Sequence, residues 1–419
     1  MPEFLKLIPI QQALQSLLSH LEGSVSKERV QTIDALGRVT AESICSPIPL
    51  PPFPRSTVDG YAVRAADTFG ASESLPAYLR LVGEVHMGAS PDFDIQAGET
   101  GVIHTGGMLP NSCNAVVMME YTQTVGQDMI EILRSVATGE NIIKVGEDVQ
   151  TGEEVIRSGV RVRPAEIGGL LALGILKFDV AKKPVVGIIS SGDEVVPPED
   201  DLLPGQVRDL NSYSLSALIE QAGGIPKRYG IFADQYDLLE AAAKRAMDDC
   251  DVVLLTAGSS TSARDLTARV INSLGNPGVL VHGVAIKPGK PTILAVCNHK
   301  VVIGLPGNPV SALVIARMFV IPVIESLLGL AEIGAHFMIQ AKLTTNVPSQ
   351  AGREDWVAGR LYSDQSAGFP GGLARYIVDP IFSKSNLIFS LVRANCLIRV
   401  PADATGLSAG ELVEVQLLA

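Results

Sequence analysis

From Lys183 to Gly329 the chain repeats one pattern, in which a short apolar strand is followed by a polar loop and a helix. The strand-like runs are PVVGIIS, KRYGIF and DVVLLT, and the segment from Pro291 onward adds a hairpin and a long helix. Alternation of strands and helices favours a parallel or mostly parallel sheet with helices on both faces. We therefore predict an α/β domain over residues 181–330.

Different patterns flank this segment and predict a multidomain chain of α/β plus β class. Ile10, Leu14 and Leu17 fall on one face of a helix that starts after Pro9, and a second helix begins at Pro164. Short β-branched runs between the two helices, with a hairpin turn expected at residues 125–128, predict a β domain inserted into one first module. We expect a split N-terminal domain (1–45 and 151–180), the inserted β domain (46–150) and a C-terminal β-barrel (331–419).

The overall charge argues against one class of function. The 419 residues carry a formal net charge of −12, which disfavours a non-specific nucleic-acid binder. Five cysteines without a CxxC pair favour reduced thiols in a cytoplasmic protein over disulfides or a zinc site. We expect no signal peptide at the N-terminus. We also expect no membrane span, because polar residues and a proline interrupt the apolar segment Val310–Leu330, which is typical of a buried helix.

Three loops of the α/β domain are rich in glycine and hydroxyl groups: residues 190–194, 256–265 and 304–312. Ligands of open α/β sheets bind where strand C-termini lead into loops and helix N-termini. One such loop is typical of an ordinary turn, whereas three at one edge indicate an anion site supplied by backbone N–H groups. Asn308 is expected to cap a helix and Pro309 to occupy its first position. The candidate binding residues are Ser190, Gly192, Asp193, Gly258, Ser259, Pro306, Gly307, Asn308 and Pro309.

Charged residues near these loops point to the same chemistry. Lys287 and Lys290 lie in KPGKP, where two prolines are expected to place both lysines on a turn, and they supply cations suited to a phosphate or oxyanion. Glu194 and Asp265 are the candidates to hold Mg²⁺ that bridges to a phosphate. The six histidines are isolated, so we expect no transition-metal site. We set a serine hydrolase aside because the chain has no GxSxG motif.

The segment PPFPRSTVDGYAVRAAD, from Pro51 to Asp67, holds more turn-forming and polar residues than a turn needs. Its prolines predict a stiff lead into the inserted domain. Ser56, Thr57 and Asp59 stand close together in this segment.

Several stretches together resemble the molybdopterin molybdenumtransferase family, which includes MoeA and the gephyrin E domain. These stretches are PPFPRSTVDGYAVRAAD, GVIHTGGMLP, VGEDV, SSGDEVV, PGQVRDLNSYSLSALI, VAIKPGKPT, GLPGNPVSA and AGRED. They follow the family order over nearly the whole chain. The resemblance implies a split first domain, a β insertion, a MogA-like α/β domain and a C-terminal β-barrel.

The resemblance also implies an activity and its site, with Ser56, Thr57 and Asp59 forming part of the wall of that site. Family members insert molybdate into adenylylated molybdopterin, release AMP and molybdenum cofactor, and use Mg²⁺. They work as elongated homodimers, with the α/β domain of one subunit facing the insertion of the other, in a pathway with molybdopterin adenylyltransferase and other cofactor-biosynthesis proteins. The residues that match functional positions of the family are Asp59, Thr105, Asp148, Glu194, Lys287, Lys290, Pro306, Pro309 and Ser385.

Two departures from the family pattern leave alternatives open. The family usually has SGGVSVG where this chain has TAGSSTSARD before Asp265, and DSN where this chain has DLN with Leu210. A variant that prefers tungstate over molybdate is therefore a further hypothesis. So is a non-catalytic scaffold or pterin-binding protein like the gephyrin E domain, although Asp59, Glu194 and the two lysines argue for catalysis. A nucleotide pyrophosphatase is a weaker hypothesis, because the flanking domains also match the family.

Overall fold

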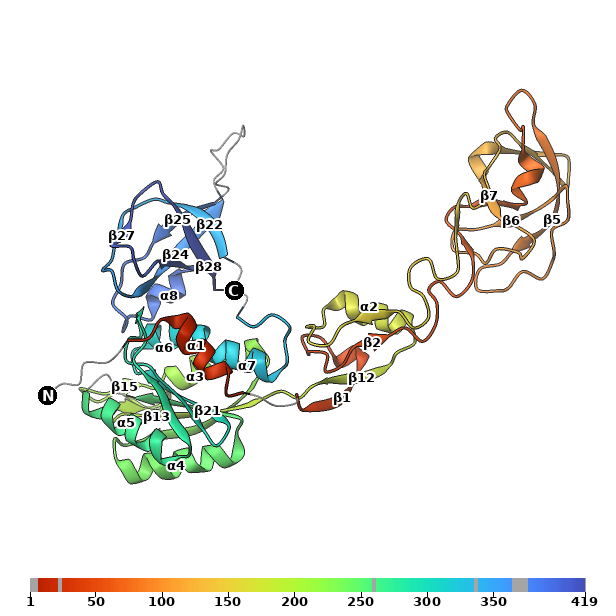
Figure 1. Ribbon diagram of the computed structural model, residues 1–419. Helices are drawn as coiled ribbons and strands as arrows, with labels where there is room; N and C mark the ends of the chain where they lie inside the picture. Colours follow the sequence, from red (N-terminus) through yellow and green to blue (C-terminus); the bar gives the residue numbers. More distant parts are fainter. Residues whose placement is uncertain (1–6, 22–24, 258–260, 335–337, 364–375, 419) are drawn as a thin grey trace.

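The structure is a computed structural model that describes residues 7–21, 25–257, 261–334, 338–363 and 376–418. Figure 1 shows an elongated chain, with the α/β domain and the barrel together at one end and the inserted β domain at the other. The small split domain lies between them on extended connections.

The α/β domain is built on a six-stranded sheet, as its alternating pattern predicts. The strand order is β16-β13-β17-β21-β20-β18, and the first four strands are mutually parallel. The last two strands pair antiparallel. The strands are β13 (Val185–Ser191), β16 (Ile225–Phe232), β17 (Val252–Ala257), β18 (Pro277–His282), β20 (Ile293–Cys297) and β21 (Lys300–Pro306).

Helices cover both faces of this sheet, so its strands are buried on both sides. Ile188 and Leu254 belong to the core on one face, while their neighbours Ile189 and Val253 belong to the core on the other. The first face carries α3 (Asn211–Ala222), α6 (Pro309–Ile315), a π-helical turn (Ala316–Val320) and α7 (Ile321–Leu327). The second face carries α4 (Tyr236–Asp249) and α5 (Thr261–Ser273).

The apolar helix near residue 310 is a core helix, as the sequence predicts. Among the described residues, Pro309–Leu327 is one helix long and apolar enough to cross a membrane, but 67% of its most apolar window is buried inside the protein. Phe319 is fully buried against the sheet of the α/β domain.

The first helix lies elsewhere than predicted. In α1 (Ile10–Leu18), Ala13 and Leu17 are fully buried in the same core as Ile188 of the α/β sheet. The expectation that this helix shares a module with the helix at Pro164 is therefore wrong for residues 10–18. Its period identifies an apolar face but does not say which surface that face covers.

Segments before and after the insertion do share a small core. Strand β1 (Lys27–Gln31) pairs with β12 (Lys177–Ala181), and β2 (Ile44–Cys45) pairs with β11 (Glu154–Ile156). The helix α2 (Pro164–Ala172) and a 3₁₀ turn (Thr32–Asp34) pack beside them. Ala35, Leu170 and Phe178 lie in this core.

The inserted segment forms its own six-stranded sheet, in the order β7-β4-β6-β5-β9-β8. Its strands are β4 (Gly60–Val63), β5 (Ala77–Val85), β6 (Glu99–Ile103), β7 (Ala115–Met118), β8 (Thr122–Val125) and β9 (Met129–Ile132), with 3₁₀ turns at Ala65–Thr68 and Met119–Tyr121. Strands β8 and β9 form the predicted hairpin. The short strands β3 (Arg55–Ser56) and β10 (Ile142–Ile143) pair where the chain enters and leaves the domain.

The C-terminal segment closes into a five-stranded barrel, because β24 pairs with β26 as well as with β25. The barrel strands are β22 (Met338–Leu343), β24 (Glu354–Ser363), β25 (Tyr376–Pro380), β26 (Cys396–Val400) and β28 (Leu412–Leu417). The smaller elements are β14 (Val195–Val196), β15 (Val207–Arg208), β19 (Ile286–Lys287), β23 (Val347–Pro348), β27 (Gly406–Leu407) and α8 (Phe389–Arg393). Strand β19 pairs with β24 and so joins the α/β domain to the barrel.

Candidate functional site

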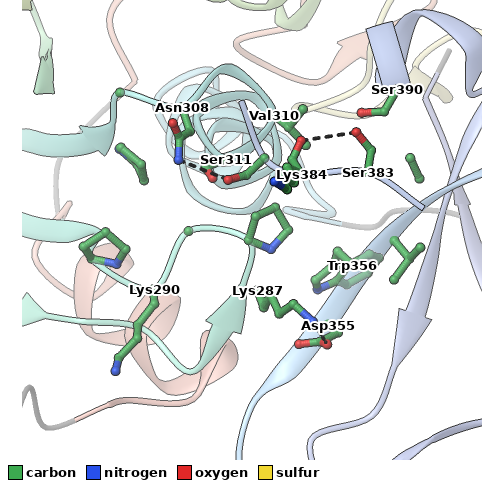
Figure 2. A pocket seen from close by; sticks show the side chains of 18 of the residues that line it. Lys287, Lys290, Asn308, Val310, Ser311, Asp355, Trp356, Ser383, Lys384 and Ser390 are labelled. Carbon is green, nitrogen blue, oxygen red and sulfur yellow. Dashed lines mark hydrogen bonds and ion pairs between the residues drawn. The ribbon is translucent and has the colours of Figure 1, made fainter. Parts of the chain in front are cut away.

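A cavity of about 710 Å³ lies between the α/β domain and the barrel. Its walls come from the Lys287–Pro291 segment, the connection between β21 and α6, and the barrel residues near Asp355 and Ser383. Figure 2 shows these side chains around the cavity. Its volume is in the range of sites for small-molecule ligands and cofactors.

Lys287 is held at one wall of this cavity by a buried carboxylate. Its Nζ donates to Asp355 Oδ2 at 3.0 Å, and Ser349 Oγ donates to the same oxygen at 2.7 Å. The Asp355 side chain is 1% exposed, and its Oδ1 lacks a hydrogen bond among the described residues. The nearest cation to Oδ1 is Arg353, whose Nε lies 3.6 Å away.

The two lysines do not share a turn, which corrects the sequence prediction. Lys287 is the last residue of strand β19, which pairs with β24 of the barrel. Lys290 lies in the loop that follows this strand. Within the described part of the chain Lys290 makes no ion pair, and in Figure 2 its side chain extends away from Asp355. One lysine is therefore fixed and the other is free to meet a ligand.

The loop after β21 begins helix α6, and its polar residues contact the barrel. Pro309 takes the first helical position and Asn308 the N-cap position, as predicted. The Asn308 side chain does not cap the helix, since its Nδ2 donates to Ser385 Oγ at 3.0 Å. The backbone N–H of Val310 donates to the Ser385 carbonyl at 3.1 Å, so Ser385 lies directly against this loop. Pro306 and Gly307 line the cavity with Asn308.

Sequence reasoning missed several polar residues of the cavity. Ser311, Ser383, Lys384 and Ser390 line it together with Asp355. Ser311 sits in the first turn of α6, Ser383 and Lys384 lie between β25 and α8, and Ser390 lies in α8. The motif AGRED was a signal for Arg353 and Asp355 and GLPGNPVSA one for Ser311, whereas nothing local marks Ser383 and Ser390. The cavity therefore combines hydroxyl donors with ammonium groups, a set suited to an oxyanion.

In the first glycine-rich loop (190–194), the Ser190 hydroxyl bonds to a protein carboxylate, contrary to the expectation that it binds a ligand. Ser190 Oγ donates to Asp209 Oδ2 at 2.9 Å, and Ser212 Oγ donates to the same oxygen at 2.6 Å. The Ser190 hydroxyl is therefore bonded to the buried carboxylate of Asp209 just before α3. Gly192 has φ 143°, and a Cβ there would come within 2.8 Å of Glu194 Oε2 and 2.9 Å of Val195 Cγ2, so this turn requires glycine.

An additional acidic residue lies beside this loop. Asp234 follows β16, the parallel neighbour of β13, and its backbone N–H donates to Asp193 Oδ1 at 3.2 Å. Burial, with the nearby charges of Asp193 and Glu194, raises the pKa of Asp234. Its buried Oδ1 has no hydrogen-bond partner among the described residues. Asp193 and Glu194 themselves are exposed.

Two carboxylates beside this loop are the candidates to hold a magnesium ion. No set of three acidic, histidine or cysteine side chains in the described ranges is arranged to hold a metal. Mg²⁺ commonly uses only one or two carboxylates together with substrate phosphates and water. Glu194 and the orphaned oxygen of Asp234 meet that requirement.

Of the second loop, Gly258 and Ser259 lie outside the described residues. Helix α5 begins at Thr261, so Asp265 lies within the helix rather than in a loop, which corrects the expected boundary. Its side chain is exposed.

The inserted domain holds the second group of candidate residues. Asp59 Oδ1 accepts hydrogen bonds from the backbone N–H of Thr105 at 2.7 Å and from its Oγ1 at 3.0 Å. These two bonds lower the pKa of the exposed Asp59 carboxyl, and His104 lowers it further. Asp148 is also exposed. Ser56 is buried and donates to the Val58 carbonyl at 2.6 Å, so it shapes the turn and does not face a site as expected.

The two groups do not meet within one chain. Figure 1 shows the inserted domain, with β6 and β7, at the opposite end of the molecule from β13, β21 and the barrel. The structure therefore gathers the lysines, Asn308 and Ser385, and separately gathers Asp59 and Thr105.

Comparisons with known proteins cover all of these domains. Residues 8–174 match the MoeA N-terminal region (domain I and II), 187–326 a probable molybdopterin binding domain, and 340–418 the MoeA C-terminal region (domain IV). The chain belongs to the MoeA family. All five of its cysteines lie in the described ranges and are unpaired there.

Relatives in this family match the chain almost end to end. A molybdopterin molybdenumtransferase of Bacillus subtilis is 32% identical, and the match covers 98% of this chain and 94% of that one. One of Haemophilus influenzae is 30% identical over 98% of both chains. The crystal structure of a molybdopterin biosynthesis MoeA protein from Pyrococcus horikoshii OT3 superposes with a TM-score of 0.84 and 33% identity, covering 98% of this chain and all of that one.

Proposed function

We propose that this protein is a molybdopterin molybdenumtransferase, which inserts molybdate into adenylylated molybdopterin and releases AMP. The observation that carries the proposal is the cavity of about 710 Å³, in a MoeA-family chain, where three lysines and several hydroxyl groups surround the start of α6. Molybdate is a dianion and the pterin substrate carries phosphates. Ammonium groups, hydroxyl donors and a helix N-terminus are the groups that attract such ligands.

Each residue has a role under this proposal. Lys290 and the serines hold an oxyanion, while Asp355 keeps Lys287 at the wall of the cavity. Pro306, Gly307, Asn308, Pro309 and Ser385 shape the pterin site, and Ser190 and Gly192 support the neighbouring loop, with Gly258 and Ser259 proposed from the sequence alone. Asp59, oriented by Thr105, and Asp148 act on the reacting phosphate group from the inserted domain.

Magnesium belongs to the same proposal. Glu194 and Asp234 would hold the ion together with the substrate phosphates, and Asp265 on α5 is a further ligand proposed from the sequence. When bound, Mg²⁺ supplies charge neutralisation of the phosphoanhydride during its cleavage.

The separation of the two residue groups favours a homodimer, in which the inserted domain of one chain reaches the α/β domain of its partner. This arrangement would unite Asp59 with the lysines, as the elongated shape in Figure 1 permits. We place the enzyme in the cytoplasm, working with molybdopterin adenylyltransferase, which would supply its substrate. Tungstate remains the alternative oxyanion.

The test is AMP release from adenylylated molybdopterin in the presence of Mg²⁺ and molybdate. We expect AMP release by the unaltered protein and loss of it in Asp59→Ala and Lys290→Ala, each with an unchanged melting temperature. Lys182→Ala is the matched control, since Lys182 is exposed and precedes β13 at the opposite edge of the sheet. Absence of AMP release with both molybdate and tungstate would contradict the proposal.

A further inference from the structure

Two titratable residues beside Asp59 have no role in the proposal above. Glu84 lies near the end of β5 and His104 directly follows β6, and these two strands are parallel neighbours. The pairing of Glu84 with Val102 brings the two side chains to the same end of the sheet. All three side chains are solvent-accessible, at 49% for Glu84, 39% for His104 and 62% for Asp59.

The imidazole of His104 spans the distance between the two carboxylates. Its Nε2 lies 2.9 Å from Glu84 Oε1, which is hydrogen-bonding distance, and its Nδ1 lies 4.0 Å from Asp59 Oδ1. A carboxylate accepts but does not donate, so Nε2 carries the proton of the first contact. The contact with Glu84 therefore holds the ring orientation that turns Nδ1 toward Asp59, and Nδ1 favours that carboxylate when the imidazole is doubly protonated.

Three groups then converge on one oxygen of Asp59. Thr105 donates to Oδ1 through its backbone N–H and its hydroxyl, and His104 Nδ1 faces the same oxygen. Among the described residues Oδ2 accepts no hydrogen bond and is left to meet a ligand. The only other charged or titratable group acting on this set in the described ranges is His86, which lies beside Glu84.

We propose that the side chains of Glu84, His104 and Asp59 act as one linked series, in which Glu84 orients His104 and His104 is a positioning residue for the Asp59 carboxylate. This inference rests on the proposed function, since it assigns Asp59 to the reaction. The hydrogen bond from His104 is the largest influence that lowers the pKa of Glu84, and His104 also contributes to the lowered pKa of Asp59.

The first test is the pH profile of AMP release by the full-length protein. His104→Ala removes an influence that lowers the Asp59 pKa, so the acid limb of kcat/KM moves to higher pH. We also expect kcat to fall by about tenfold, the effect of losing one hydrogen bond to a charged group, with little change in KM. His104→Gln serves as a second variant that retains a donor for Glu84, and His86→Asn is the control that leaves the acid limb in place.

The second test distinguishes coupled action of Glu84 and His104 from independent action of the two residues. If Glu84 acts only through His104, Glu84→Gln lowers kcat in the unaltered protein but not in the His104→Ala background. An equal effect of Glu84→Gln in both backgrounds, or an unmoved acid limb in His104→Ala, overturns the proposal.

A measurement without substrate keeps this inference distinct from the proposed activity. The Asp59 carboxyl is titrated by NMR in the full chain labelled at aspartate ¹³Cγ, and its signal is assigned by its loss in Asp59→Asn. We expect a higher midpoint in His104→Ala than in the unaltered protein, whether or not the protein releases AMP. An identical midpoint refutes the role of His104, and absent AMP release alone refutes only the proposed function.

Discussion

At the scale of single residues, the ionisation of Asp59 depends on the hydroxyl and the backbone of Thr105. Both bonds end on Asp59 Oδ1 and lower the pKa of Asp59, the backbone bond most strongly. Thr105→Val removes the hydroxyl bond, so the pKa rises part of the way toward its ordinary value. The lowered pKa keeps the carboxylate charged at mildly acid pH, and this benefit shrinks in the variant.

We therefore expect the acid limb of kcat/KM for AMP release to move to higher pH in Thr105→Val. Thr105→Ser keeps a hydroxyl and should retain the profile of the unaltered protein. An acid limb shared by all three proteins would show that this hydrogen bond does not govern catalysis.

The pair of Lys287 and Asp355 predicts a change in stability. Asp355 is 1% exposed and would lose a partner at 3.0 Å in Lys287→Ala, which leaves the buried carboxylate with Ser349 and with Arg353, whose Nε lies 3.6 Å away. Because Lys287 is 50% exposed and partly screened, we expect unfolding free energy to fall by about 1 to 2 kcal/mol.

Urea unfolding measures this loss. In the double variant Lys287→Ala with Asp355→Asn, the buried charge is gone and part of the stability should return. A double variant as unstable as the sum of both single variants would contradict the pairing.

At the scale of elements, helix α2 carries a capping box at its start. The Arg163 backbone N–H donates to Glu166 Oε2 at 2.8 Å, and the Arg163 side chain pairs with the same carboxylate. These contacts lower the pKa of Glu166 from its ordinary 4.5 to about 2. The stabilisation is therefore fully present above pH 4.5 and disappears as the pH falls toward 2.

Glu166→Gln should destabilise the protein by about 1 kcal/mol at neutral pH, which is typical of a weakened helix cap. The melting temperatures of variant and unaltered protein should converge below pH 4.5. A difference that stays constant with pH would contradict the assigned cause.

A substitution in helix α1 tests which domain this helix stabilises. Leu17 is fully buried against the α/β sheet, so Leu17→Ala should lower the unfolding free energy by about 2 to 5 kcal/mol. Hydrogen exchange should quicken in β18 and β20, which α1 contacts, and stay unchanged in α2. Gln15→Ala on the exposed face is the control. Faster exchange in α2 instead would support the expectation that α1 shares the split N-terminal domain with α2.

The sequence predicted those elements whose signals are local. The strands of the α/β sheet, the hairpin of β8 and β9, and Pro309 at the start of α6 all follow from period or turn chemistry. The partner of α1 could not be predicted, because an apolar helical face fits any apolar surface of the right shape.

The site shows the same division. Loops at the carboxyl ends of parallel strands were predictable as a group, but Asp234 was not, since only the pairing of β16 with β13 brings it to Asp193. The side chain of Asn308 was expected to cap α6, and Ser385 from the barrel takes its hydrogen bond instead. Contacts between domains, such as Lys287 with Asp355, have no local signature.

At the scale of the whole molecule, the site is divided between the two ends of an elongated chain. Asp59 and Thr105 lie in the inserted domain, while Lys290 and Asn308 lie beside the barrel. In a symmetric dimer with shared sites, each site would take one group from each chain. The central claim of the account is that these two groups form one active site.

Complementation between two inactive variants tests this claim most directly. Asp59→Ala and Lys290→Ala, with different affinity tags, are unfolded together and refolded, and the doubly tagged dimers are counted. About half of the dimers should be mixed, and each should contain one intact site, so AMP release should recover to about a quarter of the unaltered rate. No recovery despite abundant mixed dimers would contradict a site shared between two chains.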